Sequence, residues 1–93
     1  MLLQDVMWIE AAGRHAVIHT KTERIETNTT LAEFAERLLG TGFVKPIRYA
    51  LVRLQAVEEV TNDALVLKDG TEIAISREKR KEIQDAFMHF LAL

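Results

Sequence analysis

The segment NDALVLKDGTEIAIS, residues 62–76, alternates apolar and polar side chains on both sides of a central Asp-Gly pair. Alternation with a period of two is typical of a strand that buries one face. Asp69-Gly70 between two such runs is the signature of a type I′ turn. The segment therefore predicts a β-hairpin with that turn, and it indicates a strand-rich chain.

A second hairpin is expected at the start of the chain. DVMWIEA and HAVIHT are rich in β-branched and aromatic residues, and Ala12-Gly13-Arg14 separates them. Glycine in that place can supply the positive φ that a tight hairpin needs. The pattern predicts a hairpin with Arg14 and His15 at its tip, followed by a short third strand at residues 24–27.

The stretch FVKPIRYALVRLQAV, residues 43–57, consists largely of strand-forming residues. Pro46 has no N–H group and cannot donate to a sheet ladder. Regular pairing is therefore expected over residues 47–54 in an edge strand, with a further strand over residues 57–61.

Two helices are expected beside these strands. Thr30 and Glu33 match a capping box, and Gly40 is a stop signal for that short helix. Ser76 predicts the cap of a last helix from about Arg77 to Leu91. The residues predicted to face the core are Leu31, Phe34, Ala35, Leu38, Ile83, Phe87, Phe90 and Leu91, with Trp8 and Phe43 from the strands. We expect a mainly β fold of the α+β class, with antiparallel sheets, a small central helix and a C-terminal helix.

Length and composition restrict the remaining possibilities. Ninety-three residues can close one hydrophobic core, so a single domain over residues 1–93 is expected. The absence of cysteine excludes disulfides and thiolate catalysis, and it fits a cytoplasmic protein. No apolar run approaches the roughly 20 residues needed to cross a bilayer, and MLLQDVMWIEA lacks the features of a signal peptide. The chain is expected to be intracellular and unprocessed, with no membrane partner.

The charges are unevenly distributed in a chain whose formal net charge is −2. Residues 37–57 contain four cations and no Asp or Glu, and a second cluster, RxKRK, covers residues 77–81. Phosphate contacts need several cations on one surface. The alternative interpretation is that these cations are simply solvated on a half-buried sheet.

Three stretches together resemble one known family. They are DVMWIEAAGRH, LAEFAERLLGTGFVKPIRYALVRLQAV and LVLKDGTEIAISREKRKEI, and they cover nearly the whole chain. Their order and spacing resemble the LytTR-type DNA-binding domain, the output module of many bacterial response regulators. The resemblance implies an elongated, mainly antiparallel β-fold with a small helix packed between sheets. It also implies a transcription regulator of a two-component system that binds double-stranded DNA, with loops and strand ends in successive major grooves.

The resemblance also assigns DNA contacts to individual residues. His15 corresponds to a base-contacting position in the first hairpin loop, and Arg48 aligns with a variable polar position. Arginine can donate two hydrogen bonds to guanine O6 and N7, and histidine can donate to a base acceptor or a phosphate. Lys45 occupies a basic position that is expected to contact the DNA backbone. The other residues predicted to bind DNA are Arg14, Ser76, Arg77, Lys79 and Arg80.

Several positions depart from the family pattern. Ile47 replaces a histidine, Tyr49 a serine and Arg53 an asparagine, and the carboxylate of Glu78 would be repelled by phosphate. The family usually has one more strand before DVMWIE, and its absence would leave an open sheet edge that could pair with another chain, as in a homodimer. The alternative function is therefore a protein-interaction or self-association module with weakened DNA binding.

An enzyme would need a nucleophile with its base, or paired carboxylates in a cleft. Neither can be located, because Glu58 and Glu59 are adjacent in a predicted strand and would point to opposite faces. The three histidines do not have the spacing of a zinc site. We therefore expect no catalysis, no cofactor or metal, and no small-molecule substrate.

Overall fold

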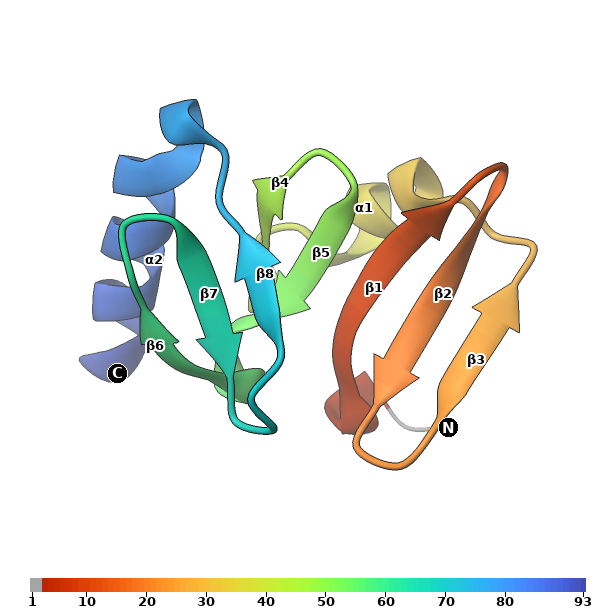
Figure 1. Ribbon diagram of the computed structural model, residues 1–93, viewed down its shortest axis with the longest axis horizontal. Helices are drawn as coiled ribbons and strands as arrows, with labels where there is room; N and C mark the ends of the chain where they lie inside the picture. Colours follow the sequence, from red (N-terminus) through yellow and green to blue (C-terminus); the bar gives the residue numbers. More distant parts are fainter. Residues whose placement is uncertain (1–2) are drawn as a thin grey trace.

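The computed structural model describes residues 3–93, which form antiparallel sheets and helices in the following order (Figure 1). The elements are η1 (Leu3–Asp5), β1 (Val6–Ala12), β2 (His15–Thr20), β3 (Arg24–Thr27), α1 (Leu31–Leu38), β4 (Phe43–Ile47), β5 (Ala50–Arg53), η2 (Leu54–Ala56), β6 (Val57–Val60), β7 (Ala64–Leu67), β8 (Glu72–Ala74), η3 (Arg77–Lys79) and α2 (Arg80–Leu91). One sheet has the strand order β3-β2-β1-β5-β4 and the other has the order β6-β7-β8. The expected mainly β fold with two α-helices is confirmed.

Strand β5 joins two hydrophobic cores because both of its faces are buried. Leu51 belongs to a core formed with β1, β2 and α1, whereas Ala50 and Val52 belong to a core that contains the smaller sheet and α2. Successive side chains of a strand point to opposite faces. Helix α1 and the smaller sheet therefore lie on opposite faces of the larger sheet, and the expectation of a helix packed between the sheets is wrong.

The aromatic residues predicted for the core all contact one of the two cores. Phe43 and Phe87 are buried, while Trp8, Phe34 and Phe90 are half-buried and pack against buried neighbours. These contacts follow the strand and helix periodicity from which they were predicted.

Residues 43–53 form a hairpin rather than one long strand. Ile47 pairs with Ala50, so Arg48-Tyr49 is a two-residue turn between β4 and β5. Pro46 lies inside β4, which tolerates proline because β4 is an edge strand with a register shift before Ile47. The continuous strand predicted over residues 47–54 is therefore wrong.

The hairpin of residues 62–76 is confirmed, but its turn differs from the expected type I′. Gly70 has φ +92°, and among residues 3–93 only glycines have positive φ, which excludes the second left-handed residue, Asp69, that type I′ requires. The N–H of Gly70 donates to the Leu67 carbonyl at 2.9 Å, and the N–H of Leu67 donates to the Thr71 carbonyl at 2.8 Å. This arrangement matches a loop with a glycine bulge.

Helix α1 begins and ends as its sequence predicts. The Thr30 hydroxyl accepts from the Glu33 N–H at 3.2 Å, and the Thr30 N–H donates to the Glu33 carboxylate at 3.3 Å, which completes the capping box. Gly40 follows the helix with φ +86°. The third predicted strand also forms, as β3, and the first hairpin has Gly13 at φ +66° in its turn.

The C-terminal helix begins later than expected, because Arg77–Lys79 forms the short 3₁₀ turn η3. Ser76 precedes that turn, but its side chain makes no capping hydrogen bond. Ile83 and Phe87 are buried, whereas Leu91 is 61% exposed, so its predicted place on the apolar face is wrong. No helix in the described part of the chain is long and apolar enough to span a membrane.

Candidate nucleic-acid interface

Three segments lie at the same end of the two sheets (Figure 1). They are the β1–β2 turn with Arg14 and His15, the β4–β5 turn with Arg48 and Tyr49, and the start of η3 with Ser76 and Arg77. We call these six residues the turn surface. Five of them are exposed, and Ser76 is half-buried. A nucleic acid at this end would meet turns and strand ends rather than an α-helix laid in a groove.

Two backbone hydrogen bonds connect the three segments. The N–H of Ala11 donates to the Tyr49 carbonyl at 2.9 Å, which joins the end of β1 to the β4–β5 turn. The N–H of Ser76 donates to the Pro46 carbonyl at 2.9 Å, which joins the chain before η3 to β4. Because both bonds are between backbone groups, the spacing of the three segments is set by the fold.

Four cations lie on or next to the turn surface and form no ion pair within residues 3–93. They are Arg14, Lys45, Arg48 and Arg77. Lys45 is half-buried on β4, directly before Pro46, while the three arginines are exposed. The fold thus brings together cations that are up to 63 positions apart in the numbering of the sequence, from 14 to 77.

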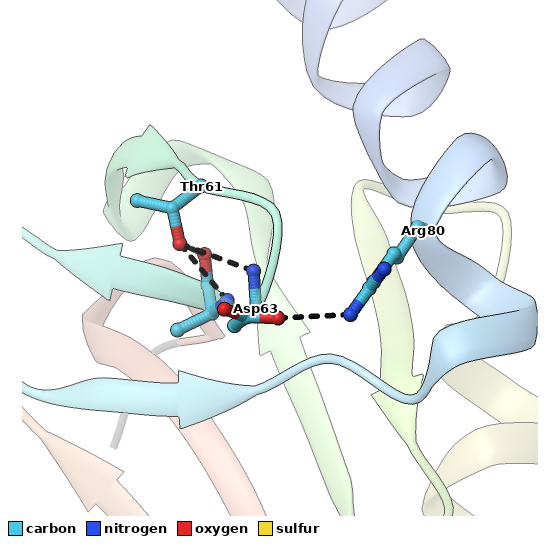
Figure 2. Close-up of polar contacts among 4 residues, drawn as sticks. Thr61, Asp63 and Arg80 are labelled. Carbon is cyan, nitrogen blue, oxygen red and sulfur yellow. Dashed lines mark hydrogen bonds and ion pairs between the residues drawn. The ribbon is translucent and has the colours of Figure 1, made fainter.

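Arg80, another residue predicted to bind DNA, is paired with a carboxylate. Its Nη2 atom lies 2.8 Å from Oδ1 of Asp63, in the turn between β6 and β7. Figure 2 shows Asp63 beside Thr61, whose hydroxyl accepts from the Asp63 and Ala64 N–H groups. The turn therefore holds a negative charge against the start of α2, which reduces the charge that Arg80 offers to a phosphate.

The two lysines of the RxKRK cluster also have acidic partners within ion-pair distance, whereas Arg77 has none within residues 3–93. Lys79 lies 3.6 Å from Glu82, and Lys81 lies 3.5 Å from Asp85. The cations at the helix start oppose the helix macrodipole, and these carboxylates compensate for them within the chain. Since such exposed pairs contribute little to stability and exchange readily, Lys79 and Lys81 can still attract phosphate at a distance.

Tyr49 is the residue of the turn surface that the sequence did not identify as a site. It lies within the strand that was predicted over residues 47–54, but it is 46% exposed in the β4–β5 turn. Its ring can stack on a base, and its hydroxyl can bond to a phosphate. The only hint of a turn in the sequence was the polar pair Arg48-Tyr49 between Ile47 and Ala50, and it lacks the Gly, Asn, Asp or Pro that usually marks a turn.

The opposite end of the molecule carries a cleft of about 570 Å³. It is lined by Gln4, Asp5, Val6, Met7, Lys21, Arg53, Gln55, Ala56, Lys68 and Asp69. The guanidinium of Arg53 donates there to the Gln4 carbonyl at 2.8 Å and to the Gln55 side chain. Arg53 is thus separated from Lys45 and Arg48, the other cations of residues 43–57, and is not part of the turn surface.

The histidines do not form a common site. The ring of His19 stacks on Trp8, with centroids 4.3 Å apart, and its Nε2 lies 2.8 Å from the Glu10 carboxylate. His15 is exposed on the turn surface and His89 is exposed on α2. In residues 3–93 no group of three or more His, Cys, Asp or Glu side chains is placed to hold a metal ion.

The fold is thus a pair of antiparallel sheets that carries exposed cations on turns at one end. The β1–β2 hairpin, helix α1 and the β7–β8 hairpin follow one another in the order that the family resemblance implied. The chain belongs to the LytTr DNA-binding domain family, whose family model matches residues 1–88. This family is one of DNA-binding domains and not of enzymes.

The chain is also similar to one curated protein and to one solved structure. The chain is 40% identical over 82 residues to the sensory transduction protein LytT of Oceanobacillus iheyensis, covering 80% of this chain and 33% of that protein. The chain thus spans about a third of the length of this relative. A solved LytTr DNA-binding domain of a methyl-accepting/DNA response regulator from Bacillus cereus superposes with a TM-score of 0.83. That match covers 92% of this chain and 84% of the other at 16% identity, and it shows the shared fold.

Proposed function

We propose that this domain binds specific sites in double-stranded DNA and regulates transcription in the bacterial cytoplasm, as the output part of a two-component system. The observation that supports this most strongly is the turn surface, where three segments with unpaired arginines are joined by backbone hydrogen bonds. Residues 1–93 would act as one DNA-binding domain.

The dimensions of the molecule fit one turn of DNA. The three segments are spread along the longest axis of the molecule, which measures 33 Å (Figure 1). One helical turn of B-DNA is about 34–36 Å long. We therefore place His15 and Arg77, at the two ends of the turn surface, toward successive major grooves.

The predicted DNA contacts on the turn surface and next to it divide into two roles by their chemistry. We assign base discrimination chiefly to Arg48 and His15, because both can donate to base acceptors. Phosphate contacts fix the register of a protein on the duplex without reading sequence. We assign these contacts to Arg14, Lys45, Ser76, Arg77, Lys79 and Arg80.

Substitution of Arg48 tests the base-reading role. Arg48→Ala should weaken binding to a selected cognate duplex by about 1–3 kcal/mol and relax the preference at one base pair. Fluorescence anisotropy titrations with the cognate duplex and with its single-base variants measure both effects. The matched control is Lys68→Ala, an exposed cation of the β7–β8 turn at the opposite end (Figure 1). Equal affinity for cognate and scrambled duplexes in all three proteins would contradict the assignment.

A second function, a protein-interaction module with weakened DNA binding, is favoured by one observation. Glu78 is exposed in η3, directly after Arg77, so its negative charge would repel a phosphate bound at Arg77. The salt dependence of duplex binding separates the two functions, because phosphate contacts release counterions and make affinity fall steeply with salt. Undetectable binding to any duplex at low salt would favour the interaction module.

A further inference from the structure

Strand β3 ends the larger sheet on one side and leaves a free edge. Within residues 3–93 its ladder partner is β2 alone. Figure 1 shows β3 at the outer side of the sheet, with no element beside its free edge. β1, by contrast, is paired on both sides, with β2 and β5. One open edge of this sheet therefore lies at β3, and none lies beside the opening strand β1.

The pairing of β2 with β3 determines which backbone groups this edge presents. The Thr20 N–H donates to the Glu23 carbonyl at 2.9 Å, and opposite pairs in an antiparallel ladder alternate between hydrogen-bonded and non-bonded. Ile18 and Ile25 then form the next hydrogen-bonded pair. The N–H and C=O groups of Arg24 and Glu26 consequently point away from β2, toward the open edge.

The side chains along this edge are complementary to a second copy of themselves. Arg24 and Glu26 are exposed and form no ion pair within the described residues, while Ile25 between them is half-buried against the α1 core. If two β3 strands pair antiparallel with Ile25 opposite Ile25, each Arg24 lies opposite a Glu26. Opposite charges in such cross-strand positions are favourable, and like charges are unfavourable.

The same charges disfavour the neighbouring registers. A register that keeps the hydrogen bonds can shift only by two residues. Such a shift places Arg24 opposite Arg24 in one direction and Glu26 opposite Glu26 in the other. The edge thus carries charges that select one pairing with its own copy, whereas charges on an edge strand commonly prevent pairing altogether.

We propose that the free edge of β3 is a self-association surface, at which a second copy of this chain adds its own β3 antiparallel with Ile25 at the two-fold axis. The inference does not depend on the function of the turn surface, which lies at the ends of the strands. Because β3 has four residues, the interface is small and the dimer is weak and dependent on concentration.

Charge reversal tests the proposed register. Sedimentation equilibrium over a range extending to millimolar protein should show wild-type dimers and a roughly tenfold or greater weakening in Arg24→Glu and in Glu26→Arg. An equimolar mixture of the two variants should associate again, because one strand then carries two acids and the other two bases. A monomeric wild type, or equal association of all samples, would overturn the proposal.

A double variant controls for misfolding and for net charge. Arg24→Glu/Glu26→Arg keeps the composition and restores the opposed charges, so its dimer should match that of the wild type. Circular dichroism and thermal unfolding of each variant establish that the sheet is intact. Failure of the double variant to associate while it remains folded would also overturn the proposed register. DNA titrations on the same samples report separately on the turn surface.

Discussion

Gly70 sets the geometry of the β7–β8 hairpin through its backbone alone. Its φ of +92° lies in a region that L side chains rarely adopt, and a Cβ atom placed there would meet no other atom within 4 Å. The cost of a substitution at this position is therefore backbone strain without a steric clash. Asparagine tolerates such conformations better than alanine does.

We accordingly predict that Gly70→Ala lowers the free energy of unfolding by about 1–2 kcal/mol. Gly70→Asn should lower it by less, since asparagine can bond locally to the backbone. Urea denaturation followed by circular dichroism measures both values. Equal losses for the two variants would argue against strain at φ as the cause.

The turn around Gly70 shows that burial selects the register of the β7–β8 ladder, which the Asp69-Gly70 dipeptide alone does not determine. A type I′ turn at Asp69-Gly70 would place Val66 opposite Ile73, whereas the observed ladder places Leu65 opposite Ile73. Directly opposed residues share a face, and Leu65 and Ile73 are both buried. The register that buries these two residues together requires the glycine bulge. The apolar alternation therefore predicted the correct register, whereas the Asp-Gly signature predicted the wrong turn type.

At the scale of elements, β4 and β5 show where prediction from sequence failed. Ile47 and residues 50–52 are apolar, and the Arg48-Tyr49 turn between them contains no Gly, Asn, Asp or Pro. Neither turn residue has positive φ, so the turn needs no glycine and leaves no conformational signature in the sequence. Helix α1, by contrast, was predictable, because its capping box is formed by two residues three positions apart, Thr30 and Glu33, and needs no distant partner.

The cap of α1 provides a test at this scale. Thr30→Ala removes the hydroxyl that accepts from the Glu33 N–H, and it should destabilise the domain by about 1 kcal/mol. The control is Glu36→Ala, an exposed residue of the same helix whose side chain makes no hydrogen bond within residues 3–93. Thermal unfolding should show a lower midpoint for Thr30→Ala alone, and equal midpoints would contradict the role of the cap.

At the scale of the whole molecule, the candidate site depends on contacts between segments that are distant in sequence. The hydrogen bonds from Ala11 to Tyr49 and from Ser76 to Pro46 have no sequence signature, because any residue with an N–H group could make them. The Arg80–Asp63 pair likewise joins residues 17 positions apart. Individual cations could be predicted as site residues, but their partners and relative spacing depend on tertiary structure.

The Arg80–Asp63 pair allows a prediction about how strongly the start of α2 attracts DNA phosphates. Asp63→Asn should leave Arg80 without its carboxylate, tighten binding to nonspecific duplex DNA at low salt, and steepen the fall of affinity with salt. Anisotropy titrations at several salt concentrations measure the slope. The control is Asp69→Asn in the β7–β8 turn, which lies at the opposite end of the sheets and should leave both quantities unchanged (Figure 1). An unchanged slope in Asp63→Asn would place Arg80 outside the phosphate contacts.

The direction of β3 has a consequence for any dimer built at its edge. Thr27, at the end of β3, pairs with Ala16 beside the β1–β2 turn, so β3 runs toward the turn surface. An antiparallel copy must run the other way, and its own turn surface then faces the opposite direction. Such a dimer could not place both copies side by side on one duplex. It would instead bridge two separate stretches of DNA. The antiparallel pairing of the two β3 strands would thus favour DNA looping over cooperative binding to adjacent half-sites.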